Sequence, residues 1–180
     1  MNLLMNENYY KNYFDTIHVF SPTVFKDPHW RNINIPRNQK HTNYDESIFR
    51  RLLARSFRSP GKTLFIFSDC GAENIRRGNY KNILDESQMN ARWYKASFIF
   101  DAQGVCSLSV PTRQNSDGAI IFETLNENEL KALSGDFGGK RFIQALELAT
   151  KEDYSFLFVH RQGPKQRYFI KFHSKINFDG

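Results

Sequence analysis

The chain has 180 residues, of which 40% are hydrophobic and 15% aromatic, so it can bury a core and is not a disordered chain. Its formal net charge of +6 and pI of about 9.3 predict a basic protein that attracts polyanions. Two cysteines without a Cys/His cluster argue against a disulfide scaffold or a bound metal, and the apolar runs are too short for a membrane-spanning helix.

The N-terminal part predicts a strand, a loop and a helix. Thr16–Phe20 is a short apolar run and should form the strand. The stretch 21–42 holds three prolines among polar residues, which is typical of a loop. A helix is expected over 45–58, because its apolar residues recur at helical spacing. Thr42 is the expected cap of this helix, with Asp45 as the acid of a capping box.

The middle of the chain predicts the centre of the sheet. Pro60-Gly61 ends the helix, and the continuous apolar run Thr63–Phe67 is expected to be a central strand. A helix over 71–84 is the next expectation. Strands over 94–100 and 105–110 follow, joined by a tight turn.

The C-terminal part mixes helices with a hairpin. A strand is expected at 119–122, a helix capped by Asn126 up to residue 133, and an amphipathic helix over 140–150. Two strands, 155–160 and 167–173, should then form a hairpin around a Gly-Pro turn.

These elements favour a single α+β domain over residues 1–180. We count about seven strands, several in hairpins, and three or four helices that do not alternate regularly with the strands. The pattern predicts a mainly antiparallel mixed sheet rather than a doubly wound parallel one.

One tetrapeptide imitates a phosphate-binding loop. Pro60-Gly61-Lys62-Thr63 matches the end of that loop, which needs a strand before it and a helix after it. Here the order of the expected elements is reversed, so we interpret the segment as a turn.

Several segments together resemble a toxin family. Trp93–Ala102 resembles a tyrosine-rich strand and its turn, Asn115-Ser-Asp117 stands where Gln-Ser-Glu is expected, and 125–130 resembles the following turn. Earlier, His18 occupies the position of a basic residue and Ser68 the start of a Ser-Thr-Ser motif. In this order the segments resemble the ADP-ribosyltransferase domain of pertussis- and cholera-type toxins.

The resemblance implies an effector or toxin domain that uses or binds NAD. His18 would hold the NAD ribose, and Ser68 would support the pocket. Asp117 would stabilise the ribosyl cation, and Asn115 would orient the acceptor on a protein substrate. The basic residues from Arg31 to Arg58 would supply the positive field for the pyrophosphate, with Arg51 and Arg55 among the residues that bind the cofactor.

Two further hypotheses come from the residues alone. A non-enzymatic module would bind nucleic acid or an acidic protein through Arg51, Arg55 and Arg58, with exposed aromatics stacking on bases. A hydrolase would use Cys70 as nucleophile, with His160 and Asp179 in the order of papain-like enzymes. The N-terminus lacks the features of a Sec signal peptide, so we expect a soluble protein that is cytoplasmic or delivered into another cell by a different route.

Overall fold

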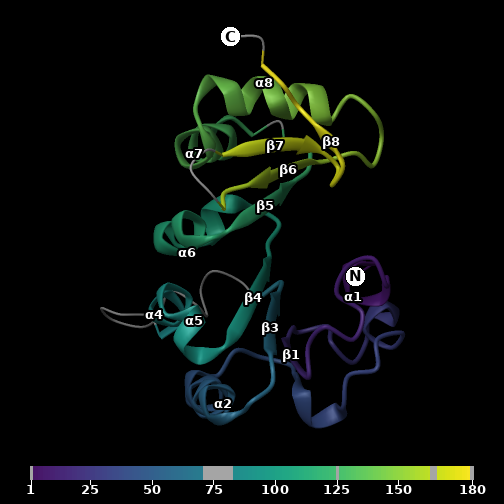
Figure 1. Cartoon of the computed structure of the whole chain (residues 1–180), viewed down its shortest axis with the longest axis vertical. Helices are drawn as coiled ribbons and strands as arrows, with labels where there is room; N and C mark the ends of the chain where they lie inside the picture. The colour runs from purple at the N-terminus through teal and green to yellow at the C-terminus, as the bar shows by residue number, and fades with distance from the viewer. Residues whose placement is uncertain (1, 71–82, 125, 163–165, 179–180) are drawn as a thin grey trace. The chain divides into compact units, whose positions relative to one another are not determined.

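The computed structural model describes residues 2–70, 83–124, 126–162 and 166–178. Contacts within the chain divide it into two compact units, Met1–Gln103 and Gly104–Gly180, which we call unit 1 and unit 2 (Figure 1). Each unit has its own sheet and its own core, and each is described by itself. The prediction of one domain over 1–180 stays a prediction.

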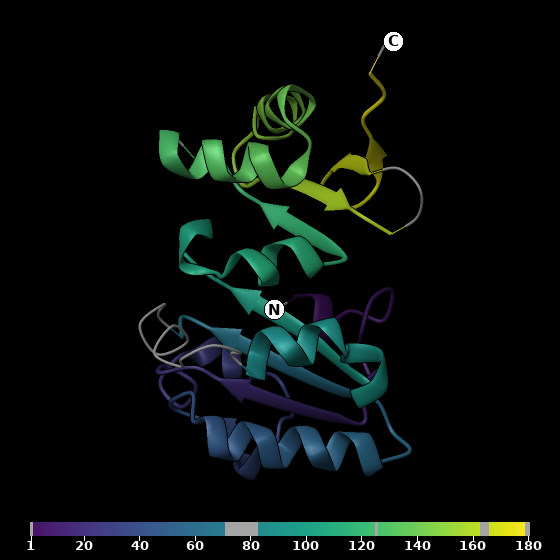
Figure 2. The same ribbon diagram turned by 90° about the vertical axis from the view of Figure 1, so that its left-hand side faces the viewer.

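Unit 1 contains a four-stranded sheet in the order β2-β1-β3-β4, and every neighbouring pair is parallel. Figure 2 shows the arrows of its three longer strands pointing the same way. The strands are β1 (Thr16–Phe20), β2 (Lys40–His41), β3 (Thr63–Ser68) and β4 (Ala96–Asp101).

The expectation of a mainly antiparallel sheet is therefore wrong. Parallel neighbours need a crossover between them, and in unit 1 helical segments supply it. The link from β2 to β3 carries α2 (Glu46–Arg58), and α4 (Ile83–Met89) and α5 (Ala91–Tyr94) precede β4. The expected helix over 71–84 lies mostly outside the described residues.

Alternating side chains of β3 build a core on each face of the sheet. Phe65 and Phe67 join Phe49 of α2 in one cluster, where the rings pack edge to face at centroid distances of 5.3 and 5.6 Å. Leu64 and Ile66 face a second cluster with residues of the connecting loops. All four side chains are buried, which confirms β3 as an interior strand of the sheet.

The second face is covered by short segments rather than long helices. Its buried residues include Val24, Trp30, Ile33 and Ile35 from the proline-containing loop. That loop and the N-terminal end contain α1 (Asn2–Met5), η1 (Pro28–Trp30) and η2 (Arg37–Gln39).

The N-cap of α2 differs from the expectation by three residues. Asp45, not Thr42, is the N-cap, and its Oδ1 accepts a hydrogen bond of 2.9 Å from the backbone N–H of Ile48. An Asp at this position satisfies an otherwise unpaired N–H at the start of the helix.

Unit 2 contains a four-stranded antiparallel sheet in the order β5-β6-β7-β8. Its strands are β5 (Gly118–Ile121), β6 (Leu157–His160), β7 (Arg167–Ile170) and β8 (Ser174–Lys175). The expected hairpin of β6 and β7 is confirmed by their antiparallel register, although 163–165 lie outside the described residues.

Helices cover one face of this sheet. They are α7 (Glu127–Phe137) and α8 (Lys140–Ala149), which bury Phe142 and Leu146 against Leu157 and Val159 of β6. The strand expected over 105–110 is wrong: η3 (Val105–Ser107) and α6 (Val110–Asn115) occupy this part of the chain. Pro111 suits the first turn of a helix, and the hydroxyl of Ser109 caps it.

Candidate functional site

The carboxyl ends of β3 and β4 bring two carboxylates to one edge of the parallel sheet. The two strands pair in register from Phe65 opposite Phe98 to Ser68 opposite Asp101. Ser68 donates a hydrogen bond of 3.0 Å from its hydroxyl to Oδ2 of Asp101. Asp69 follows directly, and its backbone N–H donates to the Asp101 carbonyl at 3.2 Å. We call Ser68, Asp69 and Asp101 the acidic edge.

Asp69 has a backbone conformation that few residues adopt. Its φ is 51°, in the left-handed region that Asp tolerates better than most residues. The hydrogen bond to Asp101 holds this turn, and the Asp69 side chain is exposed. A polar residue in such a conformation directly after a buried strand is typical of a functional position.

The end of β1 reaches the same edge. Its register with β3 pairs Phe20 with Phe67, so Ser21 lies level with Ser68. Ser21 is fully buried, and its hydroxyl lies 3.2 Å from the hydroxyl of Thr23. In open sheets of parallel strands, ligands bind outside the carboxyl ends of the strands. The acidic edge therefore lies where this fold places ligands.

Carboxylates at neighbouring strand ends are of the donor type that a hard divalent cation prefers. Mg²⁺ is held by one or two protein carboxylates and takes its remaining ligands from water and phosphate. The part of the chain that the structure describes contains no group of three or more His, Cys, Asp or Glu side chains that could enclose a metal ion.

His18 lies inside unit 1. It is buried in the middle of β1, stacks on Phe65 at a centroid distance of 5.5 Å, and its Nδ1 lies 3.4 Å from Nε2 of His41. Burial, with smaller contributions from nearby His41 and Arg55, lowers the pKa of His18 from 6.5 to about 4. At neutral pH the ring is therefore an uncharged part of the core.

Two further residues of the expected NAD site, Asn115 and Asp117, lie in unit 2. Asn115 ends α6, and its side-chain amide donates to the carbonyl of Pro111 at 2.8 Å. Asp117 is exposed in the turn before β5, and its carbonyl accepts a hydrogen bond of 2.8 Å from the N–H of Arg161. Neither residue belongs to the acidic edge.

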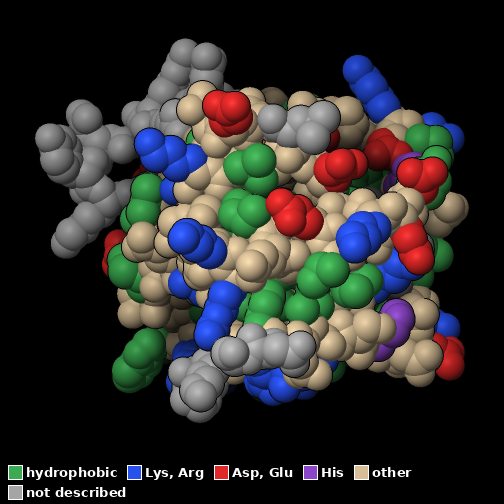
Figure 3. Space-filling view, turned by 90° about the horizontal axis from the view of Figure 1, so that it is seen from above, with side chains coloured by type: hydrophobic (Ala, Val, Ile, Leu, Met, Phe, Trp, Pro, Cys, Tyr) green, Lys and Arg blue, Asp and Glu red, His purple; other side chains and the backbone are tan. Residues whose placement is uncertain are grey.

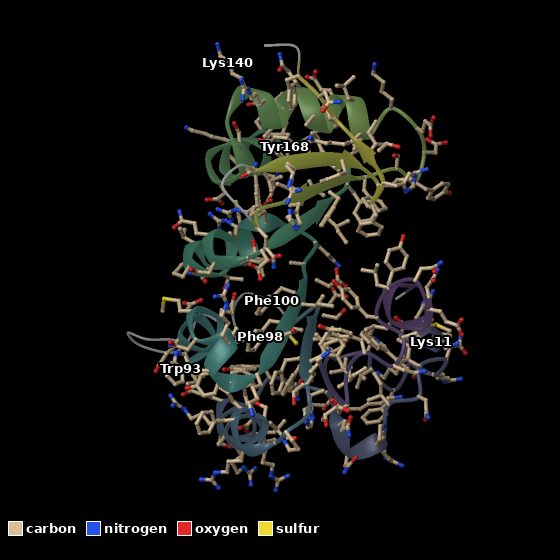
Figure 4. All side chains as sticks on the ribbon, viewed as in Figure 1. Lys11, Trp93, Phe98, Phe100, Lys140 and Tyr168 are labelled. Carbon is tan, nitrogen blue, oxygen red and sulfur yellow. The ribbon has the colours of Figure 1, made fainter. Side chains whose placement is uncertain are left out.

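The arginines of α2 are exposed, as the sequence predicted. Arg51, Arg55 and Arg58 have no carboxylate within ion-pair distance among the described residues, whereas Arg50 pairs with Glu46 at 2.7 Å. In Figure 4, side chains that end in nitrogen project from α2 away from the sheet. By contrast, the face of the molecule in Figure 3 mixes Lys and Arg with Asp and Glu, so positive and negative charges alternate there.

Cys70 does not have the environment of a nucleophile. Its thiol donates to the carbonyl of Phe20 at 3.1 Å, and burial raises the pKa of Cys70 to about 11. His160 belongs to unit 2, where its Nδ1 lies 3.2 Å from a guanidinium nitrogen of Arg167, and Asp179 is outside the described residues. A thiol with a raised pKa stays protonated at neutral pH and is a poor nucleophile.

Pro60-Gly61-Lys62-Thr63 forms the turn between α2 and β3, at the amino end of the strand. The backbone N–H of Lys62 donates to Asp15 at 2.7 Å, and its ammonium lies 3.9 Å from the centroid of the Tyr13 ring. The segment lies at the opposite end of β3 from the acidic edge, so the two do not form one site.

Sequence reasoning missed Asp69 and Asp101 as candidate site residues. The signal was present twice, because Phe65-Ile-Phe-Ser-Asp69 and Phe98-Ile-Phe-Asp101 are apolar strands that end in an acid. Its meaning depends on parallel pairing, which puts both acids at the same edge. The antiparallel sheet that we expected gave no reason to combine them.

Within the described residues, no helix has the length and apolar character needed to cross a membrane. No protein-family model matches the sequence, and no curated protein matches it either.

Solved structures do resemble the chain. The genome-packaging NTPase B204 of Sulfolobus turreted icosahedral virus 2, in complex with AMPPCP, matches with a TM-score of 0.67 and 17% identity over 93% of this chain and 89% of that chain. Its complex with ATP-γS matches with a TM-score of 0.56 and 20% identity over 72% of this chain and 66% of that chain. In that comparison the match therefore spans slightly less than two thirds of the NTPase. B204 of Sulfolobus turreted icosahedral virus, a DNA-packaging ATPase, matches with a TM-score of 0.62 and 17% identity over 85% of this chain and 81% of that chain.

These structures correct the family assignment. The expected resemblance to ADP-ribosyltransferase toxins is wrong, and so are the NAD cofactor, the transferase activity and the toxin role that depended on it, because the similar structures are packaging NTPases with ATP analogues or AMP bound. The two other functional hypotheses, a non-enzymatic module and a Cys-His-Asp hydrolase, do not describe such a fold either. At identities of 17–20% the likeness shows the fold alone: the chain has the fold of a viral genome-packaging NTPase.

Proposed function

We propose that this chain is a nucleotide-binding domain of the NTPase type and that its acidic edge is the metal-binding side of the nucleotide site. The observation that carries the proposal is the pair of carboxylates, Asp69 and Asp101, at the carboxyl ends of adjacent parallel strands. The same fold occurs in a packaging NTPase that binds ATP-γS and AMPPCP.

The chemistry of the edge agrees with this role. In phosphate-loop NTPases an Asp at a strand end helps to hold Mg²⁺, and the ion bridges phosphate oxygens and neutralises their charge. Asp69 has the corresponding position after the buried strand β3. Asp101 ends the neighbouring parallel strand, and the hydroxyl of Ser68 donates a hydrogen bond to its carboxylate.

The sequence contains no Gly-x-x-x-x-Gly-Lys-Ser/Thr motif, the usual form of a phosphate-binding loop. Such a loop supplies most contacts to the β- and γ-phosphates. We therefore expect this chain to bind a nucleotide weakly and only with Mg²⁺, with a dissociation constant on the order of 1 mM, or about −4 kcal/mol.

Calorimetric titration with ATP-γS tests the proposal. The wild type should bind in the presence of Mg²⁺ and lose binding in EDTA. Asp69→Asn should remove the Mg²⁺-dependent heat, because the amide keeps the shape of the side chain and loses its charge. Asp117→Asn is the matched control, since Asp117 is an exposed Asp in unit 2. Binding that is equal in Asp69→Asn and the wild type would refute the site, as would heat with NAD in place of ATP-γS.

We further propose that the partner is a nucleic acid, which contacts α2. Three observations support this: the net charge of +6, the exposed Arg51, Arg55 and Arg58, and a fold shared with proteins that package genomes. Each phosphate contact releases a counterion, so log affinity should fall linearly with log salt.

Replacing these three arginines with Ala should flatten the salt slope by about two units for single strands, at roughly 0.7 per contact. Arg50→Ala is the control on the same helix, because Glu46 already neutralises Arg50. An unchanged slope in the triple variant would place the contact elsewhere, and no binding at about 50 mM salt would end the proposal.

A further inference from the structure

The most exposed tryptophan of the chain belongs to a groove between two helices of unit 1. Phe57 of α2 and Asn90, Trp93 and Tyr94 at α5 line this groove, which has a volume of about 330 Å³. Trp93 is 73% exposed and Phe57 is 52% exposed. Figure 4 shows Trp93 pointing away from the sheet, beside the end of α2.

The backbone conformation of α5 keeps the Trp93 side chain exposed. The N–H groups of Trp93 and Tyr94 both donate to the carbonyl of Asn90, at 2.9 and 3.2 Å, and α5 ends at Lys95, whose φ is 50°. In this short helix Tyr94 packs against the core of unit 1, and the ring of the preceding residue, Trp93, faces solvent. A ring held by an ordered backbone loses little entropy when a ligand stacks on it.

Cationic residues flank the groove residues in the sequence: Arg58 follows Phe57, and Arg92 and Lys95 flank Trp93 and Tyr94. The ammonium of Lys95 donates to the carbonyl of Ser59 at 3.5 Å, at the C-terminal end of α2. Arg58 and Arg92 are exposed, and no described carboxylate lies within ion-pair distance of either. Glu86 on α4, the acid nearest to Arg92 in the sequence, is half-buried. Among the described residues, the groove therefore combines aromatic surface with neighbouring arginines that form no ion pair.

We propose that this groove is a stacking site for an unpaired base of a single-stranded nucleic acid, with Arg58, Arg92 and Lys95 contacting the flanking phosphates. The inference rests on the nucleic-acid partner proposed above and adds the site and the form of the ligand. Proteins that bind single strands without sequence preference combine a positive groove with aromatic rings in this way. A duplex offers its phosphates but hides the faces of its bases, so it would leave Trp93 without a partner.

The positive charge also favours a nucleic acid over a second copy of the chain as the ligand of the groove. A second copy of the chain would bring the same cations to the groove, and like charges would repel. The groove lies near the amino ends of β3 and β4, because α2 and α5 lead directly into these strands. It is therefore separate from the acidic edge at their carboxyl ends, and the two sites can be tested independently.

Tryptophan fluorescence provides the first test, performed in EDTA so that no Mg²⁺-nucleotide contributes. The chain has two tryptophans, and Trp30 is 3% exposed, so added oligo(dT) should quench mainly Trp93. Anisotropy of a labelled oligo(dT) of about 10 nucleotides gives the affinity. Trp93→Ala should weaken binding about fivefold or more, because one stacked base contributes about 1–3 kcal/mol. Trp93→Phe should retain most of the affinity, since it keeps a ring.

Two controls separate stacking from charge. Tyr154→Ala removes an aromatic side chain that is 95% exposed in unit 2 and should leave the affinity unchanged. Trp93→Ala should keep the wild-type salt slope, whereas Arg92→Ala should reduce it by about 0.7.

Equal affinity of Trp93→Ala and the wild type would overturn the inference while leaving the nucleic-acid partner intact. So would a duplex of equal length that binds as tightly and quenches as strongly, or a dimer that disappears in Trp93→Ala. If no oligonucleotide binds to any variant at low salt, the partner itself is wrong.

Discussion

His18 is a titratable side chain that unit 1 holds in its uncharged form. Its pKa falls to about 4 inside the protein, mainly through burial, while in an unfolded chain it is about 6.5. Between these pH values the unfolded chain binds more protons than the folded one. The free energy of unfolding should therefore fall as the pH falls from about 6.5 to about 4, and the contribution of His18 should stay constant below that.

The expected loss for His18 is about 2–4 kcal/mol over this window, from a shift of roughly 2.5 pH units at 1.36 kcal/mol each. Urea denaturation at about pH 7 and at about pH 4 measures it. His18→Phe should reduce the pH dependence, because Phe can stack on Phe65 and does not titrate. His29→Gln is the control, since His29 is exposed beside Asp27. Burial lowers the pKa of His41 too, so some slope should remain in His18→Phe.

At the scale of the elements, the sequence predicted the individual helices and strands better than it predicted how the strands pair. The bounds of β1 were predicted to the residue, and α2 and α8 to within one, because their apolar spacing and end signals are local. Parallel pairing was missed since it depends on which segments lie between strands. The error at 105–110 had a local cause: Val, Leu and Val favour a strand, but Ser109-Val-Pro111 begins a helix.

The candidate site depends on which strands pair and in which direction, so it was harder to predict than the individual elements. Ser68 was selected from the sequence, and it does lie at the acidic edge, but its partner Asp101 was interpreted only as a turn residue. His18, also selected, is a core residue, because alternation along β1 turns it toward the aromatic cluster around Phe65.

A buried ion pair joins two helices of unit 2. Nε of Arg113 in α6 donates to Oδ2 of Asp136 in α7, and the two side chains are only 11% and 8% exposed. Arg113 also donates to the carbonyl of Leu108 at 2.8 Å. Arg113→Ala leaves the Asp136 carboxylate buried without its partner, which should lower the free energy of unfolding by about 3–5 kcal/mol.

Urea denaturation compares this variant with Arg50→Ala, which breaks the exposed pair with Glu46 and should cost at most about 1 kcal/mol. The double variant Arg113→Met, Asp136→Leu should recover much of the stability, because no charge is then left unpaired. Equal costs for Arg113→Ala and Arg50→Ala would show that the buried pair does not hold α6 and α7 together.

At the scale of the whole molecule, the described residues form separate cores. The cluster around Phe142, Leu146 and Leu157 contains residues of unit 2 only, and the clusters around β3 contain residues of unit 1 only. Because no core cluster draws on both units, a cavity in one should not remove apolar contacts from the other. We therefore expect the two units to unfold in separate transitions.

A substitution that creates a cavity in unit 2 tests this expectation, with tryptophan fluorescence in unit 1 as the measured signal. In a Trp93→Phe background, Trp30 is the only tryptophan, and it is buried against β3. Phe142→Ala should cost about 3–5 kcal/mol in unit 2. It should split the circular-dichroism transition and leave the midpoint of Trp30 fluorescence unmoved. Leu64→Ala, a cavity in the Trp30 cluster itself, should lower that midpoint. A Trp30 midpoint that falls in Phe142→Ala would instead support the single cooperative domain predicted from the sequence.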